Sequence, residues 1–141
     1  MAATERAATV GLDTSVVLRL MTGEPAKQAE QALAYLSALN DRGGKAIVSD
    51  IVVAEAYVAL QAHYGVPKRE AVAGLLDLLK SDLVSPAPDG CAMLSLEHMT
   101  TSGQKPGFVD RLIHAQYRRR CAALVSFETA SRKLENAVVL T

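Results

Sequence analysis

Apolar residues follow two different spacings along the chain, and each spacing predicts a different element. Short continuous apolar runs at about 9–12, 46–48, 83–85, 122–126 and 137–140 predict strands buried on both faces. Apolar residues that recur every three or four positions predict helices at about 16–21, 25–39, 50–64, 68–80, 91–99 and 108–120. Helices that alternate with such strands predict an α/β fold with a parallel sheet covered on both faces.

The helical periodicity also predicts which side chains face the core. In the second, fourth and last predicted helices these are, respectively, Ala29, Ala32, Leu33, Leu36 and Leu39; Val72, Leu75, Leu76 and Leu79; and Phe108, Leu112, Ala115 and Ile113. Gly, Pro and polar residues separate the helices, most clearly at 23–25, 40–44, 65–67 and 100–107.

Length and composition favour one globular domain. The chain of 141 residues is long enough for a buried core, so residues 1–141 are expected to form a single domain. Apolar residues make up 50% and aromatic residues 4%, so Ala, Val, Leu and Ile must supply that core. The net charge is zero, so nucleic acid would have to be held locally, by a bound cation, a basic rim or a second chain.

Cysteine spacing and hydropathy favour a cytoplasmic protein. Cys91 and Cys121 are far apart in sequence and belong to no Cys-x-x-Cys pair, so neither a zinc site nor a disulfide is expected. Residues 1–9 lack the apolar stretch of a signal peptide. No run approaches the roughly 18 apolar residues of a membrane span. We therefore expect a reducing cytoplasm and no membrane partner.

Two acidic residues stand out in the first half of the chain. Asp13 directly follows the first predicted strand, where ligands collect in parallel sheets, although an Asp there also suits a helix N-cap. Thr14 and Ser15 add hydroxyls that would support either role. Glu55 lies in the middle of an apolar helix, so it is either paired, protonated or bound to a cation, or it points to solvent from a narrow polar edge.

Two more acidic residues occupy comparable places in the second half. Asp110 lies in the first turn of a helix, where the helix dipole alone would stabilise it. Glu128 follows the strand at 122–126, and Ser126 ends that strand. Asp13, Glu55, Asp110 and Glu128 can reach one crevice, where their mutual repulsion would need a divalent cation. Such a site predicts hydrolysis of a phosphodiester by activated water.

In four ordered segments the chain resembles the PIN-domain ribonucleases, and most closely the VapC-type toxins of bacterial toxin–antitoxin pairs. These segments are Gly-Leu-Asp-Thr-Ser-Val-Val-Leu at 11–18, Val-Val-Ala-Glu-Ala-Tyr at 52–57, Gly-Phe-Val-Asp-Arg-Leu-Ile at 107–113 and Leu-Val-Ser-Phe-Glu at 124–128. The family's acidic positions fall on Asp13, Glu55 and Asp110. Its last acid is usually an Asp, whereas this chain has Glu128, whose carboxylate reaches one methylene further.

The resemblance implies both a fold and an activity. It implies a three-layer α/β/α sandwich around a central, mostly parallel sheet, and Mg²⁺- or Mn²⁺-dependent cleavage of a structured RNA such as transfer RNA or ribosomal RNA. Asp13, Asp110 and Glu128 would hold the metal, and Glu55 would complete the catalytic set. A homodimer and a cognate antitoxin are the implied protein partners.

Basic residues concentrate near the end of the chain. Arg111, Arg118 and Arg132 are the candidates for phosphate contacts, although such a run also suits a solvated helix C-terminus. His114, four residues after Asp110, would either assist a proton transfer or hold structure through a hydrogen bond.

Other acidic α/β proteins fit the chain less well. A two-component receiver domain needs a pair of acids after the first strand, and an Asp-x-Asp phosphatase needs an acid at position 15, where this chain has Ser15. The alternative that stays open is a non-catalytic PIN-like module for binding and regulation. The neutral net charge and Glu128 are the features that favour it.

Overall fold

The computed structural model describes residues 8–140. Most of the N-terminal stretch in which the sequence predicts no signal peptide lies outside these residues, as do both ends of the predicted 1–141 domain. Within residues 8–140, no helix combines the length and the apolar character that a membrane span requires.

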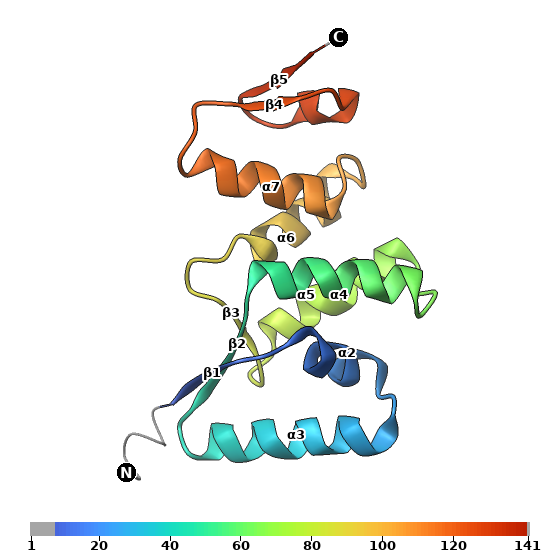
Figure 1. The fold of residues 1–141 in the computed structure, drawn as a ribbon, viewed down its shortest axis with the longest axis vertical. Coiled ribbons are helices and arrows are strands. Elements are labelled where there is room, and N and C mark those ends of the chain that lie inside the picture. The colour runs from blue at the N-terminus through green and yellow to red at the C-terminus, as the bar shows by residue number, and fades with distance from the viewer. Residues whose placement is uncertain (1–7, 141) are drawn as a thin grey trace. The chain divides into compact units, whose positions relative to one another are not determined.

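Helices and parallel strands alternate along the chain, as the sequence predicts (Figure 1). The order is β1 (Thr9–Gly11), α2 (Thr14–Thr22), α3 (Ala26–Asp41), β2 (Lys45–Val48), α4 (Asp50–Ala62), α5 (Lys68–Lys80), β3 (Ser85–Pro86), α6 (Ala92–Ser102), α7 (Phe108–Arg118), β4 (Leu124–Ser126), the 3₁₀ helix η1 (Thr129–Lys133) and β5 (Ala137–Val139). Every strand pair is parallel.

The chain forms two compact units that divide after Gly90. Unit 1 ends at Gly90 and contains the elements from β1 to β3, and unit 2 begins at Cys91 and contains those from α6 to β5. The single domain that the sequence predicts therefore stays a prediction.

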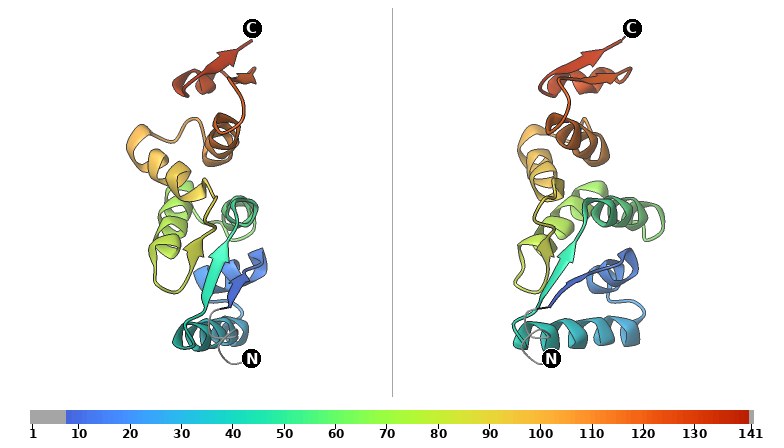
Figure 2. Two further views of the ribbon diagram at one scale, coloured as in Figure 1. Left: turned by 90° about the vertical axis from the view of Figure 1, so that its left-hand side faces the viewer. Right: turned by 60° about the vertical axis from the view of Figure 1, so that its left-hand side comes forward.

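Unit 1 is built on a sheet with the strand order β1-β2-β3. Gly11 pairs with Ile47, and beyond that pair the Leu12 N–H donates to the Ile47 carbonyl oxygen at 3.0 Å. Figure 2 shows these strands side by side, with α5 next to β3 and α3 next to β2, as their contacts require. Because the strands are parallel, the chain leaves β1 and β2 at the same edge, where α2 and α4 begin.

The core of unit 1 follows the predicted helical stripes except on α3, where Ala32 is only half-buried and Leu33 is exposed. All four predicted side chains of α5 are buried: Val72, Leu75, Leu76 and Leu79. On α3, Ala29, Leu36 and Leu39 are buried, whereas Leu33 is exposed. The prediction for Leu33 was wrong because α3 buries a narrower stripe than its apolar residues mark out.

Unit 2 packs α6 against α7 and pairs β4 with β5. Phe108 and Leu112 of α7 are buried as predicted, and Ala115 is half-buried. On α6, for which no core residues were predicted, Leu96 and Met99 are buried. Ile113 is exposed, contrary to the prediction, because it lies on the neighbouring face of α7 from Leu112. The 3₁₀ helix η1 has no counterpart among the predicted elements.

The two cysteines lie in different surroundings. Cys91 is buried, Cys121 is exposed, and neither forms a disulfide.

Candidate functional site

Asp13 lies just beyond β1, at the N-cap position of α2. Its backbone carbonyl accepts the first helical hydrogen bonds, from the N–H groups of Val16 and Val17. In the described chain its carboxylate makes no capping bond with the helix; instead Oδ2 accepts a hydrogen bond from Ser15 Oγ at 3.0 Å. The side chain is exposed, whereas the neighbouring Thr14 is buried in unit 1. The capping interpretation therefore explains the backbone of Asp13 but not its carboxylate.

Glu55 lies in the middle of α4, the helix that leaves the same sheet edge. Ser49 caps this helix, because its Oγ accepts from the Val52 N–H at 3.4 Å. Glu55 is exposed, as the solvent-facing alternative expects, and its helical neighbours Ile51 and Val58 are also exposed. A carboxylate between two uncovered apolar side chains is available to a ligand.

Asp110 is exposed in the first turn of α7, and the buried Arg111 follows it. The Arg111 guanidinium donates through Nε to Pro106 O at 2.8 Å, and through Nη2 to Gly103 O at 3.3 Å and Lys105 O at 3.4 Å. Burial lowers the pKa of the Arg111 side chain. These bonds hold the loop that leads into α7, and so fix the start of the helix that carries Asp110.

Glu128 stands between β4 and η1. Its N–H donates to Ser126 Oγ at 2.9 Å, and its carbonyl oxygen accepts from the Ser131 N–H at 3.1 Å. The backbone is thus held on both sides, while the Glu128 side chain is exposed. Ser126 therefore supports the candidate site by holding the turn that carries Glu128.

The basic residues and His114 divide between structural and exposed positions. Arg118 Nη2 forms an ion pair with Glu135 Oε1 at 3.1 Å, and Arg132 is exposed on η1. Arg111 lies inward, so the phosphate contact predicted for it has less support than those predicted for Arg118 and Arg132. His114 Nε2 donates to the Glu135 carbonyl oxygen at 2.6 Å, a bond that favours its structural interpretation.

Each unit carries two of the four candidate acids. Asp13 and Glu55 belong to unit 1, and Asp110 and Glu128 belong to unit 2. Among residues 8–140, the structure contains no group of three His, Cys, Asp or Glu side chains arranged to hold a metal ion. The donors themselves are carboxylate oxygens, which Mg²⁺ and Mn²⁺ prefer. Their chemistry therefore fits such a cation, but each unit alone has only two of the four acids.

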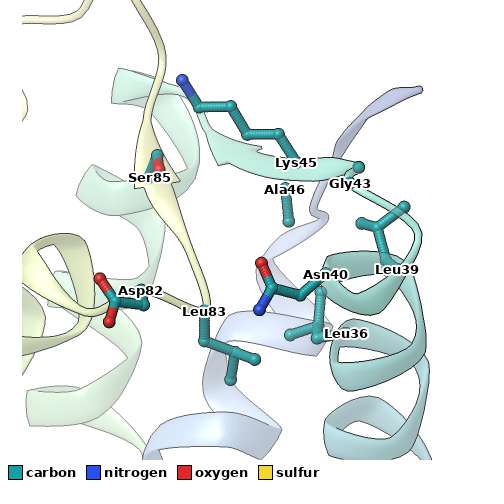
Figure 3. Close-up of a pocket in the computed structure, with 10 residues that line it drawn as sticks. Leu36, Leu39, Asn40, Gly43, Lys45, Ala46, Asp82, Leu83 and Ser85 are labelled. Atoms are coloured by element: carbon teal, nitrogen blue, oxygen red, sulfur yellow. The ribbon is translucent and has the colours of Figure 1, made fainter. Parts of the chain in front are cut away.

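A separate pocket of about 290 Å³ lies in unit 1, at the other ends of β2 and β3 (Figure 3). It contains none of the four acids, and both apolar and polar residues line it. The lining side chains labelled in Figure 3 include Leu36, Leu39, Asn40, Lys45, Asp82, Leu83 and Ser85. In parallel α/β sheets ligands bind at the carboxyl ends of the strands, so this pocket is not the candidate catalytic site.

The PIN domain family model matches residues 10–136. The chain therefore belongs to the PIN domain family, and its predicted α/β PIN-like fold class is confirmed. PIN domains are generally nucleases that depend on divalent metal ions, and the family thus indicates hydrolysis of nucleic acid. A search of curated protein sequences found no match to the chain.

Two side chains have positions that the sequence did not reveal. Arg111 was predicted to face a substrate, and its inward position depends on loop carbonyls that a sequence pattern does not show. Phe127 lies in the segment 124–128, to which the resemblance assigns no role for an aromatic side chain, and it is 75% exposed. The proximity of Phe127 to Glu128 in sequence was the one available signal.

Proposed function

We propose that this protein is a metal-dependent endoribonuclease in which Asp13, Glu55, Asp110 and Glu128 act together. The observation that carries the proposal is the extent of the family match. It runs from residue 10 to 136, so it crosses the division after Gly90 and includes all four acids. On this basis we propose that residues 1–141 are a single PIN-like domain and that the four acids serve one activity.

In the proposed site, Asp13, Asp110 and Glu128 hold Mg²⁺ or Mn²⁺. When bound, such a cation lowers the pKa of water and offsets the charge that develops on a phosphodiester. Ser15 Oγ orients Asp13 Oδ2 through its hydrogen bond, and Ser126 fixes the backbone of Glu128. Glu55 is the remaining carboxylate, and it accepts the proton that the attacking water gives up. The water oxygen bonds to phosphorus, and the bond from phosphorus to the leaving oxygen breaks.

The biological role we propose is that of a toxin in a toxin–antitoxin pair. The support is the resemblance of segments 11–18, 52–57, 107–113 and 124–128 to VapC-type toxins. That role implies a cytoplasmic homodimer, a cognate antitoxin that blocks the acids, and a structured RNA substrate such as transfer RNA or ribosomal RNA. Exposed Arg118 and Arg132 are suited to contact its phosphates.

A non-catalytic PIN-like module for binding is the second candidate. Two features of the sequence favour it: Glu128 stands where the family usually has an Asp, and the net charge of the chain is zero. Under this alternative, changes at the acids would leave the affinity for a partner intact.

Metal dependence tests the proposed function directly. Wild-type protein, purified free of any antitoxin, is incubated with total cellular RNA in Mg²⁺, Mn²⁺ or excess chelator, beside Asp110→Asn and Asp77→Asn. Asp77 is an exposed acid of α5 outside the proposed site, so its variant controls for the loss of one negative charge. We expect discrete fragments from wild type and Asp77→Asn with metal, and none from Asp110→Asn or with chelator. Equal behaviour of all the folded proteins would favour the binding module.

Restoring the family's usual acid tests the role of Glu128. Glu128→Asp keeps a carboxylate at position 128, on a backbone that Ser126 holds. We therefore expect this variant to change the cleavage rate by less than about tenfold, which corresponds to about 1.4 kcal/mol of activation free energy. Glu128→Gln removes the charge and should lower the rate further. The rates are measured over a range of Mn²⁺ concentrations. If Glu128→Gln cleaves as fast as wild type throughout that range, Glu128 is not a metal ligand.

A further inference from the structure

Phe127 is the first residue beyond β4 and comes directly before Glu128. With 75% of its surface exposed, it is the most exposed large apolar side chain among the described residues of unit 2. The other phenylalanine of the chain, Phe108, is completely buried. Because burying such a side chain stabilises a protein, its exposure beside a candidate catalytic acid calls for an explanation.

Hydrogen bonds hold the backbone on both sides of Phe127. The Ser126 carbonyl oxygen accepts from the Leu140 N–H at 2.8 Å, and Ser126 Oγ accepts from the Glu128 N–H at 2.9 Å. One residue later, the Glu128 carbonyl oxygen accepts from the Ser131 N–H at 3.1 Å. These three hydrogen bonds hold the turn in which the aromatic ring is presented to solvent.

The surroundings of Phe127 in unit 2 combine an apolar surface with charge. Val125 and Val138 are paired in register across β4 and β5, and both are exposed. On the other side of Phe127 in sequence, Glu128 is followed by the exposed Arg132 of η1. A ligand that matches this arrangement has a flat apolar face and a nearby negative charge, and a nucleotide of an RNA chain has both.

We propose that Phe127 is a substrate-binding residue that stacks on an unpaired base of single-stranded RNA. This inference rests on the proposed nuclease function, because it takes Glu128 to lie beside the phosphodiester that is cut. Stacking on an aromatic ring contributes about 1–3 kcal/mol per base and tolerates any base, because every base has a π-face. Unpaired bases occur in the loops of folded RNA, so Phe127 selects an unpaired nucleotide without selecting a sequence.

A single tryptophan reports this contact directly. The chain contains no Trp, so Phe127→Trp introduces the sole tryptophan, and Leu94→Trp places one at another exposed position in unit 2. Both variants are titrated in excess chelator with a short single-stranded RNA carrying a fluorescent label, so that binding is followed without cleavage. We expect saturable quenching of tryptophan emission in Phe127→Trp, little change in Leu94→Trp, and weak quenching by the same sequence as a duplex.

Two further variants measure the contribution of the ring. Phe127→Ala should raise the Kd for the single strand by roughly five- to a hundredfold, and Phe127→Tyr should restore it, because tyrosine keeps an aromatic face. Thermal unfolding of each variant shows whether the fold is kept.

Several results would overturn the stacking proposal. The first is blue-shifted, acrylamide-resistant emission of Phe127→Trp in the free protein, which would mean that protein covers the ring. The second is tryptophan emission that does not change when RNA binds. The third is wild-type RNA affinity in Phe127→Ala. Quenching in chelator together with no cleavage in Mg²⁺ or Mn²⁺ would support stacking and overturn the nuclease function. Cleavage with no quenching would support the nuclease function and overturn stacking.

Discussion

Asp13→Asn should abolish RNA cleavage while leaving the fold and the thermal stability nearly unchanged. In the proposed site Asp13 is a metal ligand, and a neutral amide offsets no cation charge. Losing several kcal/mol of transition-state stabilisation lowers the rate by about a thousandfold or more. Stability is kept because Asn serves an N-cap as well as Asp does, and because the Asp13 carboxylate makes no capping bond in the described chain. Single-turnover cleavage rates and thermal unfolding measure the two effects separately.

The neighbouring hydroxyl provides a graded control for Asp13→Asn. Ser15→Ala removes the hydrogen bond to Asp13 Oδ2 but keeps the carboxylate, so we expect a rate loss of about tenfold, in line with one hydrogen bond to a charged group. Raising the Mn²⁺ concentration should recover part of that loss. A Ser15→Ala variant that cleaves more slowly than Asp13→Asn, or an Asp13→Asn variant as active as wild type, would contradict the proposed role of Asp13.

Arg111→Met should destabilise the protein by about 3 kcal/mol or more, which corresponds to a fall in Tm of about 10 °C. Met retains most of the buried stem, so the loss comes from the hydrogen bonds to Pro106 O, which would be left buried without this donor, and to the partly buried Gly103 O. Lys105 O keeps a second donor, Lys133 Nζ, at 3.2 Å. Urea unfolding measures the change in free energy, and hydrogen exchange of the loop amides locates it.

Arg118→Met is the matched control for Arg111→Met. It makes the same chemical change on the same helix, but Arg118 is 36% exposed and its partner Glu135 is 72% exposed. A solvent-exposed ion pair contributes about 0–1 kcal/mol, so this variant should unfold close to wild type. If the two variants are equally stable, the buried hydrogen bonds of Arg111 do not hold unit 2 together.

Sequence patterns predicted the bounds of an element well where the apolar spacing and the helix-breaking residues indicate the same ends. The helix at 68–80 matches α5 at both ends, because Pro67 precedes it and its leucines recur at helical spacing. The end of α6 was missed because residues 100–102 are polar. Their hydroxyls bond back to the helix, as Thr100 Oγ1 does to Glu97 O at 2.7 Å, and so the helix continues to Ser102. The strand predicted at 83–85 is found at Ser85–Pro86 as β3, because pairing with Ile47 and Val48 decides its position.

The candidate site was partly accessible from sequence. Asp13 follows β1 and Asp110 lies in the first turn of α7, as predicted, because strand ends and helix starts can be read from local patterns. The roles of Arg111 and Phe127 were not accessible. They depend on which carbonyls lack donors and on which surfaces stay uncovered, and both properties arise only when separate segments pack.

The division of the four acids has a consequence for synthesis of the protein. A ribosome completes unit 1, with Asp13 and Glu55, before it begins unit 2 at Cys91. Under the proposed mechanism, a chain interrupted at that point holds one of the three proposed metal ligands. Translation products abandoned before Glu128 would therefore release no active nuclease, and the capacity to cut RNA would arise only once Glu128 has been added.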